Sequence, residues 1–260
     1  MSGVVEHATR LGPHLARVVA VEPLGGLALV RIELDPRTDL GTPGQFHMLS
    51  NPTGRDYLSR PVGLIQLDDG VGFVVDQASA ASEMAGPEIA VLGPLGRGFD
   101  LSETSAETTL LVAAGFGLTV MPGIGRLHRG IRLIAGLRQA DHLPLLDHVT
   151  GVTIDLPQVP PDLVTDPLIE ALAGGQYSQV LAAGPAGLGA AVARICADHG
   201  VASQIALEAP MACGFGACNG CAVQLDGAWK RCCIDGPVVD GQRLLGSASP
   251  SVASSSPSHC

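Results

Sequence analysis

The sequence predicts an α+β protein of several domains: an N-terminal antiparallel β-barrel, a central α/β domain with a parallel sheet, and a small C-terminal lobe. The first part of the chain shows short apolar runs separated by turn residues, which is typical of barrels. The middle part alternates strand-like and helix-compatible segments, which favours a parallel sheet. The third part carries five of the seven cysteines. We expect domains at residues 1–103, 104–201 and 202–245, followed by a disordered tail at residues 246–260.

Composition narrows the class of protein. The 260 residues include 15 Lys and Arg against 25 Asp and Glu, a net charge of −10, which argues against a nucleic-acid-binding protein. Hydrophobic residues make up 46% and charged residues 15%, so a packed core is expected. The longest nearly uncharged stretch, residues 110–125, is shorter than a membrane span, and the first residues lack an apolar signal segment. We expect a cytoplasmic protein that binds neither membrane nor nucleic acid.

Apolar runs mark the strands of the predicted barrel. They lie at Ala16–Val21, Leu27–Ile32 and Val71–Val75. The segment Gly93–Phe99 is rich in glycine and contains a proline, so we expect a turn that closes the barrel there.

The central domain is predicted from an apolar run that opens into glycines. Thr109–Ala114 reads as a buried strand and leads into Gly115, Phe116 and Gly117. Three more strands are expected at Ile131–Gly136, Val152–Asp155 and Gln179–Pro185, and a helix at Leu188–His199.

The cysteines form the most specific local pattern. Cys213, Cys218 and Cys221 follow C-x₄-C-x₂-C, and either Cys232 or Cys233 comes later. Plant-type [2Fe–2S] sites have this spacing, with three thiolates in one loop and a fourth from elsewhere. Small residues leave the backbone N–H groups of this loop open to an anionic cluster; they are Gly214, Gly216, Ala217 and Gly220.

Two other roles for these cysteines remain open. Structural zinc is the first, although zinc sites favour paired C-x₂-C knuckles and the chain has one such pair. A disulfide is the second, which a reducing compartment disfavours. Cys196 and Cys260 lie apart from the group, and we assign no role to them.

Three further motifs are informative because of their order in the chain. P-G-Q-F stands at residues 43–46, R-P-V-G at residues 60–63 and G-P-L-G-R-G-F at residues 93–99. Arg60 could clamp a phosphate, but alone it equally fits an exposed arginine at the start of a strand. Followed by a glycine-rich strand turn, the set resembles the ferredoxin reductase-like flavoproteins.

Two cysteine-containing segments narrow this resemblance. E-A-P-M-A-C-G-F-G-A-C-N-G-C at residues 208–221 and R-C-C-I-D-G-P-V at residues 231–238 resemble one family, the electron-transfer subunit of class B, NAD-linked dihydroorotate dehydrogenase. The resemblance extends to about Leu245. It implies that Cys233 is the fourth cluster ligand and that Cys232 is a spectator.

The resemblance also implies FAD in the barrel and a nicotinamide nucleotide on the α/β domain. The residues implied for FAD are Arg60, Pro61, Val62, Gly63, Phe73, Val74 and Val75. Those implied for the nicotinamide nucleotide are Gly115, Gly117, Gly184 and Pro185. The chain departs from the family pattern at several places: Gly63 replaces a serine, Val75–Ser79 replaces G-x-G-T, the glycine turn keeps only Gly115 and Gly117, and Ala183 replaces a cysteine.

The function that the resemblance implies is electron transfer. The eight histidines are scattered, and we identify no acid–base set for oxidising an organic substrate, so we expect no catalytic residues in this chain. Substrate oxidation would lie on an FMN-containing dihydroorotate dehydrogenase subunit, in a heterotetramer of two plus two chains. Electrons would pass from that subunit through [2Fe–2S] and FAD to NAD⁺, in de novo pyrimidine (UMP) biosynthesis. The alternatives are a reductase subunit of another complex and a scaffold that has lost nicotinamide turnover.

Overall fold

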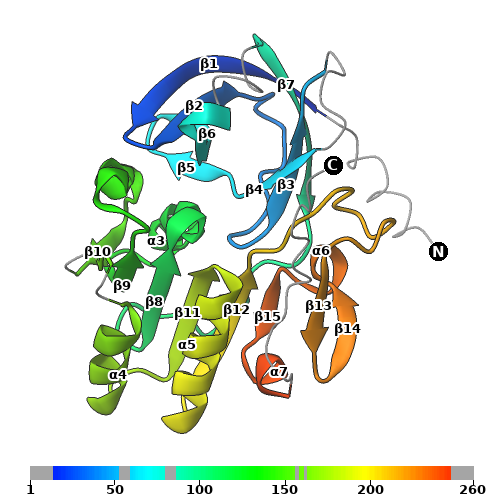
Figure 1. Ribbon diagram of the computed structural model, residues 1–260. Helices are drawn as coiled ribbons and strands as arrows, with labels where there is room; N and C mark the ends of the chain where they lie inside the picture. The colour runs from blue at the N-terminus through cyan, green and yellow to red at the C-terminus, as the bar shows by residue number, and fades with distance from the viewer. Residues whose placement is uncertain (1–13, 53–58, 80–85, 156–157, 161–162, 247–260) are drawn as a thin grey trace.

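The first part of the chain forms a seven-stranded antiparallel sheet in the computed structural model, which describes residues 14–52, 59–79, 86–155, 158–160 and 163–246. Its strands are β1 (His14–Leu24), β2 (Leu27–Glu33), β3 (Phe46–Ser50), β4 (Arg60–Val62), β5 (Ile65–Leu67), β6 (Gly70–Asp76) and β7 (Glu88–Leu95). The order is β4-β3-β7-β1-β2-β6-β5. Only residues 63 and 64 join the edge strands β4 and β5, so the sheet curves back on itself (Figure 1). The predicted antiparallel sheet is confirmed.

Proline residues occupy positions in this sheet that tolerate a missing N–H group. Pro61 lies in the edge strand β4, so Arg60 and Pro61 belong to a strand and not to a turn. The turn that we expected to begin at Gly93 begins later, because β7 continues to Leu95. The pairing of β7 with β3 shifts register around Gly93 and Pro94, and such a bulge accommodates both residues.

The second sheet has six strands in the order β10-β9-β8-β11-β12-β15. Its strands are β8 (Thr109–Ala114), β9 (Ile131–Gly136), β10 (Val152–Ile154), β11 (Gln179–Gly184), β12 (Ala202–Leu207) and β15 (Val238–Asp240). The first five strands of this order run parallel, as predicted, and β15 adds an antiparallel edge. Since β12 begins at Ala202, the sheet continues across the expected domain boundary at residue 201.

Helices and a hairpin complete the fold. The helical segments are η1 (Gly115–Val120), α3 (Met121–Leu127), η2 (Ala140–His148), α4 (Thr165–Ala173), α5 (Ala186–Asp198), α6 (Cys232–Asp235) and α7 (Gln242–Leu245). The hairpin pairs β13 (Ala222–Leu225) with β14 (Ala228–Arg231), beside β15 in Figure 1. None of the described helices has both the length and the apolar character that a membrane span requires.

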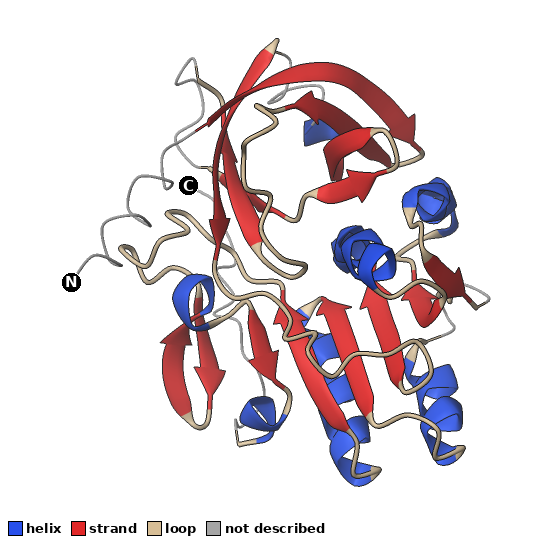
Figure 2. Cartoon of the chain, turned by 180° about the vertical axis from the view of Figure 1, so that it is seen from behind, coloured by secondary structure: helices blue, strands red, loops and turns tan. Residues whose placement is uncertain are grey.

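The parallel sheet is buried on both faces, which explains its continuous apolar strands. Leu110 and Val112 of β8 belong to a buried cluster with residues of α4 and α5. Those helices lie on one side of the strands, which stand in front of them in Figure 2. Leu111 and Ala113, which alternate with them, belong to a cluster that includes η1, α3 and residues of β2, β5 and β6. One hydrophobic core therefore joins the two sheets.

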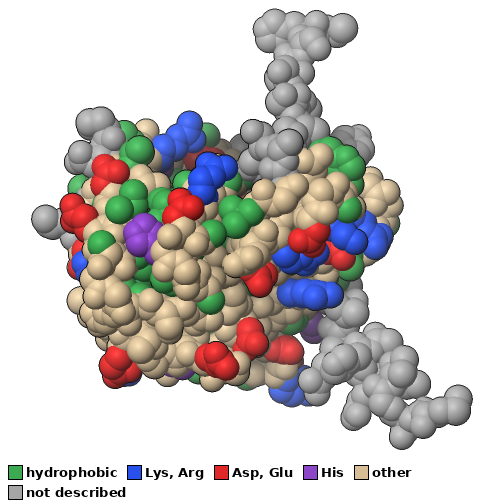
Figure 3. Space-filling model, turned by 90° about the horizontal axis from the view of Figure 1, so that it is seen from below, with side chains coloured by type: hydrophobic (Ala, Val, Ile, Leu, Met, Phe, Trp, Pro, Cys, Tyr) green, Lys and Arg blue, Asp and Glu red, His purple; other side chains and the backbone are tan. Residues whose placement is uncertain are grey.

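Charged side chains of both signs are interspersed on the surface. On the face shown in Figure 3, Lys and Arg stand in small groups near Asp and Glu and form no continuous basic patch. Of the predicted tail, the structure describes Gly246, and the rest, including Cys260, lies outside the described residues.

A close backbone contact ties the β1–β2 turn to the α/β sheet. A Cβ atom on Gly25 would lie 1.9 Å from the backbone oxygen of Asp141 in η2, and the φ of Gly25 is +66°. Both features require glycine. The turn can therefore approach η2 only without a side chain at this position.

We predict that Gly25→Ala destabilises the protein more than Gly130→Ala. Both glycines have positive φ, +66° and +79°, but a Cβ on Gly130 would meet nothing within 4 Å. In both variants the free energy of unfolding should fall by about 1–2 kcal/mol, because alanine disfavours the left-handed conformation. In Gly25→Ala the free energy of unfolding should fall by about 1–3 kcal/mol more, because the added methyl group overpacks against η2. Urea unfolding measures both free energies, and equal losses would contradict the proposed contact.

Candidate functional site

A cavity of about 380 Å³ lies at the junction of the two sheets. From the antiparallel sheet it is lined by Arg60–Gly63, Val74 and Val75. From the parallel sheet it is lined by Gly117 and Gly184. The fold thus brings together residues that the resemblance implies for FAD and residues that it implies for the nicotinamide nucleotide.

A second cavity, of about 560 Å³, lies at the carboxyl ends of β8, β9 and β11. Gly115 and Pro185 line it. In open α/β sheets, ligands bind in the crevice at the carboxyl ends of the strands. This cavity therefore has the place expected for a nucleotide.

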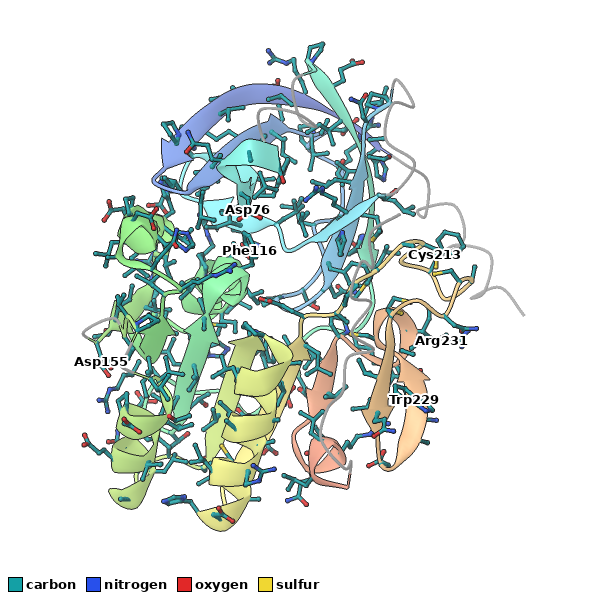
Figure 4. All side chains as sticks on the ribbon, in the orientation of Figure 1. Asp76, Phe116, Asp155, Cys213, Trp229 and Arg231 are labelled. Atoms are coloured by element: carbon teal, nitrogen blue, oxygen red, sulfur yellow. The ribbon has the colours of Figure 1, made fainter. Side chains whose placement is uncertain are left out.

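Three side chains border both cavities: Asp76, Phe116 and Glu208. Figure 4 shows Asp76 and Phe116 between the two sheets, on segments far apart in the chain. A group bound in one cavity would meet a group bound in the other beside these residues.

Phe73 does not line either of these cavities. Its side chain is fully buried, in the apolar cluster of the antiparallel sheet that includes Val30 and Val91. Alternation along β6 turns Val74 to the opposite face, toward the cavity, while Val75 belongs to the same cluster as Phe73 and lines the cavity from the end of the strand.

Glycine at position 117 brings two backbone segments into close contact. A Cβ on Gly117 would lie 2.2 Å from the carbonyl oxygen of Ala183. The end of β11 therefore packs directly on η1, and both line the first cavity. A glycine that permits close approach is a feature of nucleotide-binding turns.

Glu208 is the carboxylate between the cavities. Burial by the surrounding protein raises its pKa to about 7, although the Gly117 N–H donates a hydrogen bond that lowers it. The side chain remains accessible to solvent through the cavities that it borders. A carboxyl group that titrates near neutral pH beside a ligand cavity can hold or release a proton there.

The cysteine loop continues the wall of the first cavity. Glu208, Ala209, Pro210 and Met211 line the cavity, and Cys213 follows two residues later. A Cβ on Gly214 would lie 2.4 Å from Met48 of β3, so this loop packs closely on the antiparallel sheet. Figure 4 shows Cys213 on this loop, beyond β12.

The thiols that the spacing singled out fall into two pairs. Cys221 Sγ lies 3.2 Å from Cys233 Sγ, although the two residues come from different segments. Cys213 and Cys218 share a side-chain hydrogen bond within the loop. Among the described residues, no three His, Cys, Asp or Glu side chains converge on one point that could hold a single metal ion. The six described cysteines are free thiols.

Backbone N–H groups surround Cys213. Desolvation raises its pKa, but hydrogen bonds from the backbone of Cys218, Phe215 and Ala217 outweigh it and lower the pKa to about 6. Gly214 and Gly216 have φ values of +77° and +88°, a conformation that turns a loop around an anion. The loop is thus built to stabilise thiolate.

Cys232 and Cys233, at the start of α6, have different partners. Cys232 Sγ points into the core, 3.8 Å from the Leu207 carbonyl oxygen, and burial raises its pKa to about 12. The Cys233 N–H donates to Cys221 Sγ at 3.5 Å, and the two sulfur atoms are adjacent. Cys233 Sγ thus contacts Cys221 Sγ directly, whereas Cys232 Sγ hydrogen-bonds to the Leu207 carbonyl oxygen.

Large apolar side chains are exposed around the cysteine loop and the hairpin. Phe215 is 58% exposed, Trp229 57% and Ile234 40%. Arg231 lies among them and donates to the Gly216 carbonyl oxygen at 2.8 Å. Solvent-exposed aromatic side chains around this group of thiols indicate a surface for a partner protein.

Comparison with known proteins agrees with this site. A family model described as the iron–sulfur cluster binding domain of dihydroorotate dehydrogenase B matches residues 208–245. The electron transfer subunit of dihydroorotate dehydrogenase B (NAD(+)) from Fusobacterium nucleatum is 32% identical over 221 residues, 76% of this chain and 84% of that protein. The chain belongs to this family.

Another member of the family of electron transfer subunits, from Clostridium acetobutylicum, is 28% identical over 218 residues, 78% of this chain and 86% of that protein. Solved structures agree on the fold. An NADH-dependent reduced ferredoxin-NADP oxidoreductase matches with a TM-score of 0.70 at 21% identity, over 89% of this chain and 90% of that chain. The ferredoxin reductase of carbazole 1,9a-dioxygenase matches with a TM-score of 0.62 at 20% identity, over 73% of this chain and 66% of that chain. The ferredoxin reductase-like fold implied by the motif order is confirmed.

Sequence reasoning did not single out Asp76, Phe116, Thr119 or Glu208 individually as lining residues. Asp76 and Glu208 each follow the buried part of a strand, and a carboxylate in that position was an available signal. Phe116 and Thr119 lie inside the glycine-rich turn, where nothing in the sequence shows which side chains reach the other sheet.

We predict that Glu208→Gln stabilises the protein at pH values above 7 and has little effect near pH 4.5. The folded state holds the proton more tightly than the unfolded state, since the pKa rises from 4.5 to about 7. Ionisation therefore costs stability as the pH rises through 7, and glutamine avoids that cost. Thermal unfolding of both proteins between pH 4.5 and pH 8 measures the difference. A difference that does not change with pH would contradict the assignment.

Proposed function

We propose that this chain carries electrons from a dihydroorotate-oxidising, FMN-containing subunit through a [2Fe–2S] cluster and FAD to NAD⁺. The observation that carries the proposal is continuity: one wall segment, Glu208–Met211, borders the first cavity and leads directly to Cys213. The two cavities meet at Asp76, Phe116 and Glu208. Three redox groups placed in this order would be neighbours.

The residues around the first cavity fit FAD. Arg60 supplies a cation for a phosphate, Val74 and Val75 an apolar wall, and Gly63 and Gly117 space for a flat ring. The curved antiparallel sheet would act as a barrel that holds this group. Bound FAD exchanges a pair of electrons with a nicotinamide and single electrons with an iron–sulfur cluster.

The residues around the second cavity fit a nicotinamide nucleotide. Gly115, Gly187 and Pro185 let the backbone and the start of α5 approach a pyrophosphate. Arg138 adds a positive charge to the same lining. A cavity of about 560 Å³ thus remains at this edge of the sheet despite the reduced glycine pattern, which favours nicotinamide turnover over a scaffold that has lost it.

The thiol pairs favour an iron–sulfur cluster over structural zinc. Each iron of a dinuclear cluster takes two protein ligands, which matches one pair from Cys213 and Cys218 and another from Cys221 and Cys233. Structural zinc sites favour paired C-x₂-C knuckles, and the chain has one such pair. Cluster thiolates persist in a reducing compartment, which supports a cytoplasmic location.

We also propose how the chain is divided and assembled. The domains would be residues 1–103 for FAD, 104–201 for the nicotinamide nucleotide and 202–245 for the cluster, with β12 and β15 of the third part completing the sheet of the second. The exposed side chains of Phe215, Trp229 and Ile234 would contact the partner subunit. Two copies of each subunit would form the heterotetramer.

Co-expression with a dihydroorotate-oxidising subunit tests this function. The complex should contain, for each copy of this chain, about two irons, two sulfides and one FAD, and NADH should bleach the flavin absorbance. Dihydroorotate should reduce NAD⁺ only when both subunits are present. Zinc without visible absorbance, or no flavin reduction at millimolar NADH, would overturn the proposal.

The same complex tests the partner surface. Trp229→Ala should reduce recovery of the catalytic subunit, whereas Leu127→Ala, at 63% exposed, provides a control on α3. Equal recovery of the catalytic subunit with both variants would show that it binds another surface of this chain.

We predict that Cys233→Ser abolishes the cluster and that Cys232→Ser retains it. Cys233 contacts Cys221, while Cys232 lies in the core. Iron content and the visible spectrum of the purified variants measure this. Loss of iron in Cys232→Ser with retention in Cys233→Ser would reverse the assignment of the fourth ligand.

A further inference from the structure

A hydroxyl group lies close to the position where Gly63 lacks a side chain. A Cβ on Gly63 would lie 3.0 Å from Thr119 Oγ1 and 3.7 Å from Val120 Cγ2. Gly63 belongs to the connection between β4 and β5, whereas Thr119 belongs to η1. The Thr119 hydroxyl on η1 therefore lies directly beside the place where a side chain at position 63 would begin.

The Thr119 hydroxyl is buried and oriented. The residue is 3% exposed, and its Oγ1 donates to the carbonyl oxygen of Phe116 at 2.8 Å. A hydroxyl has one proton and two lone pairs. With its proton used by Phe116, Oγ1 can act only as an acceptor toward anything bound beside it.

Thr119 is the only hydroxyl-bearing residue among the described residues that line the first cavity. The neutral amide side chain there, Gln45, is already used. Its Oε1 accepts from the Thr42 N–H at 2.9 Å and its Nε2 donates to the Gly96 carbonyl oxygen at 2.8 Å. The remaining polar side chains, of Arg60, Asp76 and Glu208, are ionisable. A neutral hydrogen-bond acceptor from a side chain can therefore come from Thr119.

We propose that the Thr119 hydroxyl replaces the side chain absent at Gly63 and accepts a hydrogen bond from an N–H group at the edge of the flavin ring. The inference rests on the proposed function, since it requires FAD in this cavity. It assigns a cofactor contact of the antiparallel sheet to a residue of the α/β sheet. FAD binding then depends on how the two sheets are packed.

A reciprocal exchange of the two side chains tests the proposal. Thr119→Ala removes the hydroxyl and clears space, while Gly63→Ser introduces one from the other sheet. Thr119→Ser keeps the hydroxyl and is the matched control. The dissociation constant for FAD, measured by flavin fluorescence on protein stripped of the cofactor, and the spectrum of bound flavin are the readouts.

Thr119→Ala should weaken FAD binding about fivefold, the effect of one neutral hydrogen bond. Gly63→Ser should also weaken binding, because its Cβ would lie 3.0 Å from Thr119 Oγ1. The double variant Gly63→Ser/Thr119→Ala should recover much of the affinity, and Thr119→Ser should bind within about twofold of the unmodified chain. Thermal unfolding without FAD identifies any variant that fails to fold.

Each outcome decides a different point. Unchanged affinity and spectrum in Thr119→Ala, or strictly additive losses in the double variant, would overturn the role of Thr119 and leave the proposed function standing. Absence of FAD binding by the unmodified chain would overturn both.

Discussion

Close packing of η1 against the end of β11 is the contact on which the site depends. Because Gly117 lacks a side chain, the turn approaches within backbone contact of Ala183, and any Cβ there would overlap its carbonyl oxygen. The same turn carries Phe116 and Thr119 into the junction of the sheets and places the Gly117 N–H against Glu208. One backbone approach thus shapes the first cavity and part of the second.

The hydrophobic core makes this junction stable. Leu111 and Ala113 of the parallel sheet share a buried cluster with Leu27 and Ile65 of the antiparallel sheet. The cavities are therefore enclosed between two elements that are held together by apolar burial, the dominant favourable term in folding. A ligand that spans such a junction contacts both sheets.

Two of the cysteines in the loop have partners within the loop, and a third has its partner in a distant segment of the chain. Cys213 and Cys218 are held by neighbouring backbone N–H groups, and this depends only on the loop conformation. Cys221 is completed by Cys233, which arrives after the hairpin β13–β14. The hairpin and α6 thus bring a fourth cysteine against the local motif.

Local patterns in the sequence predicted the kinds of secondary structure and the chemistry of the cysteine loop. Apolar alternation and glycine turns predicted both sheets, and C-x₄-C-x₂-C predicted a metal-binding loop, because these signals lie within a few residues of one another. The bulge at Gly93–Pro94 was not predicted, since a proline inside a strand depends on the register of its partner. Tertiary packing decides which side chains meet: it puts Cys233 against Cys221, as the family resemblance implies, it places Val74 but not Phe73 in the cavity lining, and it sets Thr119 beside Gly63. The physical reason is that each of these pairings depends on the side-chain direction and packing of segments distant in the chain, which local patterns do not encode.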